Sequence, residues 1–134
     1  MGGEICTPIR SEIDIVTARQ QGRMLASQAG FSGVDQVIIA TAISEMARNI
    51  VTYAKTGEII LSVVTEADNR RCFIIIARDE GPGIPDIELA MRDGYSTGKS
   101  LGLGLPGARR LMDEFDIVSE VGKGTTVTMK KRAG

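Results

Sequence analysis

Two polar side chains that could support acid–base and metal chemistry, Glu45 and Asn49, stand four residues apart in a segment with helical periodicity. Residues at this spacing lie on the same face of a helix. A carboxylate can accept the proton of an attacking hydroxyl group. An amide oxygen suits Mg²⁺, which takes its other ligands from phosphate and water. The pair therefore predicts a metal and phosphate site, with Asn49 as the metal ligand.

A simpler explanation of the same row exists, because Thr41 and Thr52 extend it along the helix. Taken alone, a polar row on a helix is more often a solvated face than a site, by roughly two to one. Ile38 and Ala42 adjoin the row, however, and apolar neighbours of this kind indicate a cleft. The row by itself leaves both explanations open.

A third candidate, Asp79, ends an apolar run and enters the glycine-rich stretch Asp79-Glu-Gly-Pro-Gly-Ile84. An ionised carboxylate accepts hydrogen bonds from an exocyclic amine such as the amino group of adenine. The alternative is that Asp79 only caps the turn that begins at Glu80. Gly81 and Gly83 favour a binding site, because glycines on both sides of Pro82 allow a flat ligand to approach closely.

Two further glycine clusters occupy residues 98–104 and 122–124. The first precedes a predicted helix, where free backbone N–H groups and glycine flexibility suit an anion. We expect Gly102 and Gly104 to hold phosphates there and Lys99 to supply a positive charge. A flexible loop that caps the helix explains this cluster equally well. The cluster contains neither the P-loop pattern nor a dinucleotide-binding fingerprint.

Composition limits the classes of protein that remain. The 134 residues suggest one domain over residues 1–134, and 43% hydrophobic content suffices for a core. The net charge of -1 gives no sign of a nucleic-acid partner, and no stretch resembles a membrane span or signal core, so we expect a cytoplasmic protein. The absence of histidine excludes serine–histidine triads, histidine metal sites and a phosphohistidine relay within this chain. Cys6 and Cys72 are expected to be free thiols.

Hydrophobic periodicity and turn residues predict the elements that must position these side chains. Helices and hairpins segregate along the chain, which favours a two-layer α+β sandwich over a doubly wound parallel sheet. Pro8 restricts the first strand to an edge or a strand end. The predicted strands are 3–9, 57–66, 71–78, 115–120 and 125–131, and the predicted helices are 12–29, 35–53, a short one near 85–92, and 103–114.

Four motifs together resemble, in chain order, the N, G1, G2 and G3 boxes of the GHKL, or Bergerat, ATP-binding fold. They are Ser44-Glu-Met-Ala-Arg-Asn49, Asp79-Glu-Gly-Pro-Gly83, Leu101-Gly-Leu-Gly-Leu105 and Gly124-Thr125. The resemblance implies a mixed, mostly antiparallel sheet covered by three helices on one face. It also implies ATP and Mg²⁺ as cofactors.

The segments 14–20, 42–50 and 104–115 are similar to the small serine/threonine kinases of bacterial partner-switching systems, notably the switch kinase of the stressosome. The resemblance implies that Glu45 is the general base, that Asn49 holds Mg²⁺, and that Asp79 binds the adenine amino group with support from Thr125. It further implies that Gly81, Gly83, Gly102 and Gly104 let the loops fold over the nucleotide. Lys99 and Leu103 complete the set of predicted cofactor-binding residues. Tyr53 and Ser100 depart from fuller versions of these motifs, which carry a histidine and a glycine there.

The same resemblance implies the partners. The substrates would be Ser or Thr residues of STAS-domain scaffold and antagonist proteins, and the released kinase would activate a downstream partner such as a PP2C-type phosphatase. An alternative is an anti-sigma factor kinase that acts mainly by sequestering a sigma factor. A third, weaker alternative is an ATPase module without a protein substrate.

Overall fold

The computed structural model describes residues 4–84, 91 and 104–133. These residues form five strands and three α-helices, the second of which continues into a π-helical turn, η1. The elements are β1 (Ile5–Ile9), α1 (Glu12–Gln28), α2 (Gly33–Asn49), η1 (Ile50–Ala54), β2 (Gly57–Thr65), β3 (Arg71–Asp79), α4 (Gly104–Leu111), β4 (Glu114–Glu120) and β5 (Gly124–Arg132).

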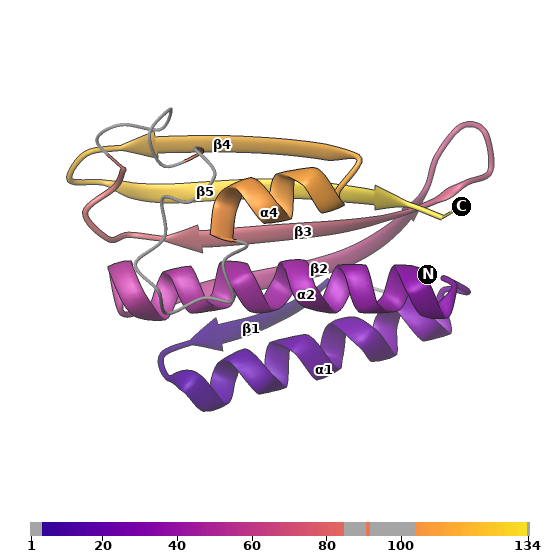
Figure 1. Ribbon diagram of the computed structural model, residues 1–134, viewed down its shortest axis with the longest axis horizontal. Helices are drawn as coiled ribbons and strands as arrows, with labels where there is room; N and C mark the ends of the chain where they lie inside the picture. Colours follow the sequence, from indigo (N-terminus) through magenta and orange to yellow (C-terminus); the bar gives the residue numbers. More distant parts are fainter. Residues whose placement is uncertain (1–3, 85–90, 92–103, 134) are drawn as a thin grey trace.

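The five described strands make one sheet in the order β1-β2-β3-β5-β4, and every neighbouring pair is antiparallel. The described helices lie together on one face of this sheet (Figure 1). The predicted two-layer α+β architecture is therefore confirmed, and the parallel pairing that a mixed sheet would contain does not occur among the described strands. Pro8 lies in β1 at the sheet edge, as predicted, where its missing N–H group interrupts no inner ladder.

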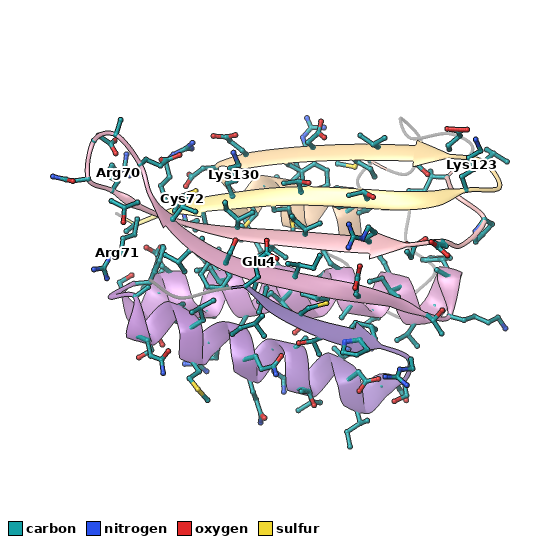
Figure 2. All side chains as sticks on the ribbon, turned by 180° about the vertical axis from the view of Figure 1, so that it is seen from behind. Glu4, Arg70, Arg71, Cys72, Lys123 and Lys130 are labelled. Carbon is teal, nitrogen blue, oxygen red and sulfur yellow. The ribbon has the colours of Figure 1, made fainter. Side chains whose placement is uncertain are left out.

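The core lies between the sheet and the helices. The helix-facing side chains in the middle of β2 and β3 are fully buried and form one cluster with apolar side chains of α2: Ile59, Leu61, Phe73 and Ile75 with Ile39, Ile43 and Met46. Phe31, at the turn between α1 and α2, contacts Phe73 edge-to-face with ring centroids 5.9 Å apart. The other face of the sheet, which carries Cys72 and Lys130, has no described helix over it (Figure 2).

Helices α1 and α2 pack closely because small residues line their contact. A Cβ atom at Gly22 would lie 2.2 Å from Cδ1 of Ile43, so a larger residue there requires the fully buried Ile43 to move. Ser32 caps the start of α2, because its Oγ atom accepts a hydrogen bond from the Asp35 N–H at 3.1 Å. Gly30, with φ of +87°, follows the end of α1.

Two predicted helix ends are wrong, and the structure gives a reason for each. The helix predicted for 103–114 stops at Leu111, because the Asp113 N–H donates to the Lys130 carbonyl and the Asp113 carboxylate accepts the Arg132 N–H. These bonds draw the chain into the sheet, so β4 begins at Glu114. The helix predicted to reach Tyr53 is α-helical only to Asn49 and then π-helical. The short helix predicted near 85–92 falls almost entirely outside the described residues.

Both cysteines are free thiols, Cys6 exposed and Cys72 buried, as predicted. No helix in the described segments is both long and apolar enough to cross a membrane.

The burial pattern of β3 makes a stability prediction. Ile75 is fully buried on the helix side, whereas its neighbour Ile76 lies on the open face and is partly exposed. Ile75→Ala should lower the free energy of unfolding by about 2–5 kcal/mol, because it leaves a cavity in the core. Ile76→Ala is the matched control and should cost clearly less. Urea unfolding followed by circular dichroism measures both, and equal costs would contradict the assignment of the two faces.

Candidate functional site

The candidate acid–base residue, Glu45, lies in the last half of α2 and is only 3% exposed. Asn49 is the final α-helical residue, one turn further on, and is partly exposed. Thr41 begins the same row, but its hydroxyl donates to the Val37 carbonyl at 2.8 Å. The burial of Glu45 rules out the solvated-face explanation at that position.

The π-helical turn η1 connects Asn49 to the sheet. Its defining bond joins the Lys55 N–H to the Ile50 carbonyl at 2.7 Å, and Lys55 then takes a φ of +74° that ends the helix. A Cβ atom at Gly81 would lie 2.6 Å from Cβ of Ala54. The end of η1 is therefore packed against the turn that follows β3, and in Figure 1 both lie at one end of the molecule.

Asp79 is the last residue of β3, and its Oδ1 atom accepts the Gly81 N–H at 2.9 Å. The turn-capping role considered for Asp79 is thus present in the structure. It occupies one carboxylate oxygen, and a carboxylate has further lone pairs on its second oxygen. Capping and ligand binding are compatible for this residue, and the cap holds the carboxylate in a defined orientation.

The sheet brings Asp79 together with Thr125. The two residues are direct partners in the β3–β5 pairing, so their side chains stand side by side on one face. That face is the helix side, because Ala77 and Val127, two residues away on each strand, are both buried in the core. The predicted association of Asp79 with Thr125 is therefore present in the geometry.

A further residue in this row, Ser119 of β4, is the partner of Thr125 in the β4–β5 pairing. Its Oγ atom lies 2.8 Å from Thr125 Oγ1 and accepts the Ile84 N–H at 2.7 Å. Ser119 is not among the predicted site residues. A single serine in a strand of alternating exposure has no sequence pattern that marks it as part of a binding site. The only available clue was its position opposite Thr125 across the predicted Gly122–Gly124 turn.

The glycines of the two turns fill places that no larger residue could occupy. A Cβ atom at Gly83 would lie 2.5 Å from the Glu120 carbonyl oxygen, and one at Gly124 would lie 2.1 Å from that of Asp79. Both glycines also have positive φ, +79° and +115°. The close approach expected at Gly81 and Gly83 is thus made by neighbouring protein segments, so chain packing already requires glycine at both positions.

The phosphate end of the predicted site is only partly described. Gly104 is the first residue of α4, which packs beside α2. Lys99, Ser100, Gly102 and Leu103 lie outside the described residues, so their proposed roles stay predictions.

Arg78, the residue before Asp79, is paired on the opposite face of the sheet. Arg78 Nε donates to Glu58 Oε2 at 2.7 Å, and this hydrogen bond lowers the pKa of the Glu58 carboxyl group. Cys6 Sγ donates to Glu58 Oε1 at 3.2 Å, which raises the pKa of the Cys6 thiol. Because Arg78 is paired on that face, its charge does not point toward Asp79.

Comparisons with known proteins identify the family of this chain. The family model described as "Histidine kinase-, DNA gyrase B-, and HSP90-like ATPase" matches residues 34–133. The serine/threonine-protein kinase RsbT of Bacillus subtilis is 51% identical over 127 residues, which cover 95% of this chain and 95% of that protein. An anti-sigma F factor of Geobacillus stearothermophilus is 37% identical over 100 residues, 69% of this chain and 66% of that protein.

A solved structure of the RsbU and RsbW domains of a Mycobacterium tuberculosis protein has the same fold. It superposes with a TM-score of 0.65 at 22% identity and covers 98% of this chain and 33% of that one. The family model and the RsbT match span the helix of Glu45 and Asn49 and the strands of Asp79 and Thr125. The chain therefore belongs to the histidine kinase-, DNA gyrase B- and HSP90-like ATPase family, in which it is a homologue of the serine/threonine-protein kinase RsbT.

Proposed function

We propose that this chain is an ATP- and Mg²⁺-dependent protein serine/threonine kinase whose substrates are STAS-domain proteins of a stressosome-type partner-switching module. The observation that carries the proposal is that two residue pairs lie on elements that come together at one end of the molecule (Figure 1). Asp79 and Thr125 stand side by side on the sheet, and Glu45 and Asn49 share a face near the end of α2. The contact between Ala54 and Gly81 joins the two pairs.

Asp79 and Thr125 form the adenine end of the proposed site. The Asp79 carboxylate accepts a hydrogen bond from the amino group of the base, and the Thr125 hydroxyl supports it directly or through a water molecule. The cap between Asp79 Oδ1 and the Gly81 N–H preorganises the carboxylate before the nucleotide arrives. A preorganised acceptor loses less conformational entropy when the ligand binds.

Asn49 forms the metal end. In the described part of the chain, no group of three or more acidic, cysteine or histidine residues could hold a metal ion by itself. A single amide oxygen fits a cation that is held chiefly by the phosphates of a nucleotide and by water. When bound, Mg²⁺ would neutralise charge on the transferred phosphoryl group.

Glu45 acts as the general base in the proposed transfer. Its carboxylate accepts the proton of the substrate hydroxyl while that oxygen forms a bond to the γ-phosphorus, and the bond from the γ-phosphorus to the ADP oxygen breaks. Because Glu45 is 3% exposed, a hydroxyl group reaches it only after surrounding groups have moved. Such burial also excludes water, which suits a kinase that must avoid hydrolysing ATP.

Released from its substrates, the kinase would activate a downstream protein such as a PP2C-type phosphatase, in the cytoplasm. The alternative is an anti-sigma factor kinase that acts mainly by sequestering a sigma factor. The similarity to RsbT is greater in identity and in coverage than the similarity to the anti-sigma F factor, which favours the first reading. Co-purification with a sigma factor instead of with STAS-domain proteins would reverse this preference.

The adenine end can be tested with Asp79→Asn. The amide removes the negative charge that accepts the amino group, so ATP should bind about 10- to 100-fold more weakly, while the protein remains folded. Isothermal titration with ATP and Mg²⁺ measures the change. Asp116→Asn, an exposed residue on the other face of the sheet, is the control and should bind ATP normally. An unchanged affinity in Asp79→Asn would place adenine elsewhere.

The metal end can be tested with Asn49→Ala. Added Mg²⁺ should strengthen ATP binding in the native protein and in the control Thr52→Ala, whose side chain is exposed one helical turn beyond. In Asn49→Ala most of this gain should be lost, because the amide ligand is gone. Titrations with Mg²⁺ and with EDTA separate the two conditions. A full Mg²⁺ effect in Asn49→Ala would remove this residue from the metal site.

The reaction itself can be tested with Glu45→Gln, using labelled ATP and a purified STAS-domain protein as acceptor. Loss of a general base should slow phosphoryl transfer by about 10²- to 10⁴-fold, with ATP affinity largely retained. Glu12→Gln, on the exposed first turn of α1, is the matched control. Transfer at the native rate in Glu45→Gln would show that another group accepts the proton.

A further inference from the structure

Ser119 makes several polar contacts beside the proposed adenine site and has no role in the proposed phosphoryl transfer. Its Oγ atom accepts the Ile84 N–H at 2.7 Å and lies 2.8 Å from Thr125 Oγ1 and 3.2 Å from the Gly124 carbonyl oxygen. Ser119 is partly buried, and as the β4 partner of Thr125 it faces the same side as that residue. One hydroxyl group therefore contacts three separate backbone or side-chain groups beside Asp79 and Thr125.

The first consequence is mechanical. Ile84 follows the Asp79–Gly83 turn, and its bond to Ser119 fastens that turn to the β4–β5 hairpin. The Gly122 N–H, which donates to the Pro82 carbonyl at 2.9 Å, makes a second link between the same two segments. Of these two links, only the one through Ser119 depends on a side chain. A substitution at Ser119 can therefore loosen the turn while leaving the backbone contact in place.

The second consequence concerns one proton. Ser119 has a single hydroxyl hydrogen, which can go to Thr125 Oγ1 or to the Gly124 carbonyl. Either hydroxyl can be the donor across the 2.8 Å contact between Ser119 Oγ and Thr125 Oγ1, and the Gly124 carbonyl at 3.2 Å is the other acceptor for the Ser119 hydrogen. When Ser119 donates to Thr125, the Thr125 hydrogen is left to donate to a ligand. In that arrangement a donor at Thr125 stands beside an acceptor at Asp79.

We propose that Ser119 is a positioning residue that makes the site selective for adenine over 6-oxopurines. The inference rests on the proposed adenine site. The edge of adenine offers an amino donor next to a ring-nitrogen acceptor, which complements Asp79 and Thr125 in this arrangement. Hypoxanthine offers a carbonyl acceptor next to an N–H donor, which opposes both. A site built from fixed hydrogen-bond partners rejects the mismatched ligand because its own groups are then left unpaired.

The test compares the binding of ATP and ITP to the full chain and its Ser119→Ala variant by isothermal titration in Mg²⁺. The native protein should prefer ATP. In Ser119→Ala the Thr125 hydroxyl can rotate and the turn is held less firmly. The affinity for ATP should therefore fall about 3- to 10-fold and the ATP-to-ITP preference should narrow by a similar factor. Ser119→Thr keeps the hydroxyl and should restore the preference. Thr128→Ala, on the open face of β5, should bind both nucleotides as the native protein does.

A purely structural role would lower the Tm or weaken both nucleotides equally, so an unchanged ATP-to-ITP ratio in Ser119→Ala would overturn the proposal. If Ser119→Ala fails to fold, Ser119→Cys keeps a similar volume with a weak hydrogen-bonding group and should narrow the ratio in the same way. Asp79→Asn is measured alongside. If Asp79→Asn loses ATP affinity while the ratio is unchanged in Ser119→Ala, only the role of Ser119 fails. If Asp79→Asn binds ATP normally, the adenine site itself fails.

Discussion

The register of the antiparallel sheet is the constraint on which the candidate site depends. Gly57, Asp79, Thr125 and Ser119 are successive partners across β2, β3, β5 and β4, so a single row crosses four strands. A slip of one residue in β3 would turn Asp79 to the open face. Ile75 lies four residues before Asp79 on the same face of β3 and is fully buried. A slip of one residue would turn Ile75 out of the core, so the core opposes the slip. The apolar core thus specifies which way the site residues point.

The second constraint is the joint between the helix layer and the sheet at the end of α2. The π-helical turn packs against Gly57, the first residue of β2, and Gly81, in the turn after β3: a Cβ atom at Gly57 would lie 2.9 Å from Ile50 Cγ2, and one at Gly81 would lie 2.6 Å from Ala54 Cβ. Ile50 is itself part of the core. Because η1 follows Asn49 directly, this packing sets how far the metal end of the proposed site stands from its adenine end.

Much of this arrangement could be predicted from local pattern, since the alternation in β3 and the helical row through Glu45 and Asn49 are properties of short segments. The errors arise where contacts with residues distant in sequence determine where a helix ends or which side chain joins the site. The apolar residues after Asn49 continue at helical spacing, and only their packing against Gly57 and Gly81 reveals a π-helical turn. Helix α4 ends early because Asp113 bonds to β5. Ser119 matters only through the strand opposite it, so no neighbour in sequence marks it.

The burial of Glu45 bears on function through its cost. Taking a carboxylate out of water is unfavourable, and an apolar side chain of similar volume at a buried position is often neutral or stabilising. Ala42 and Met46, which neighbour Glu45 on α2, are fully buried. A carboxylate beside them carries a desolvation cost that an apolar side chain would avoid. Such a departure from local consistency is expected where chemistry selects the residue. In a chain without histidine, the buried glutamate one turn before Asn49 is the residue to which the proposed function assigns the acid–base role.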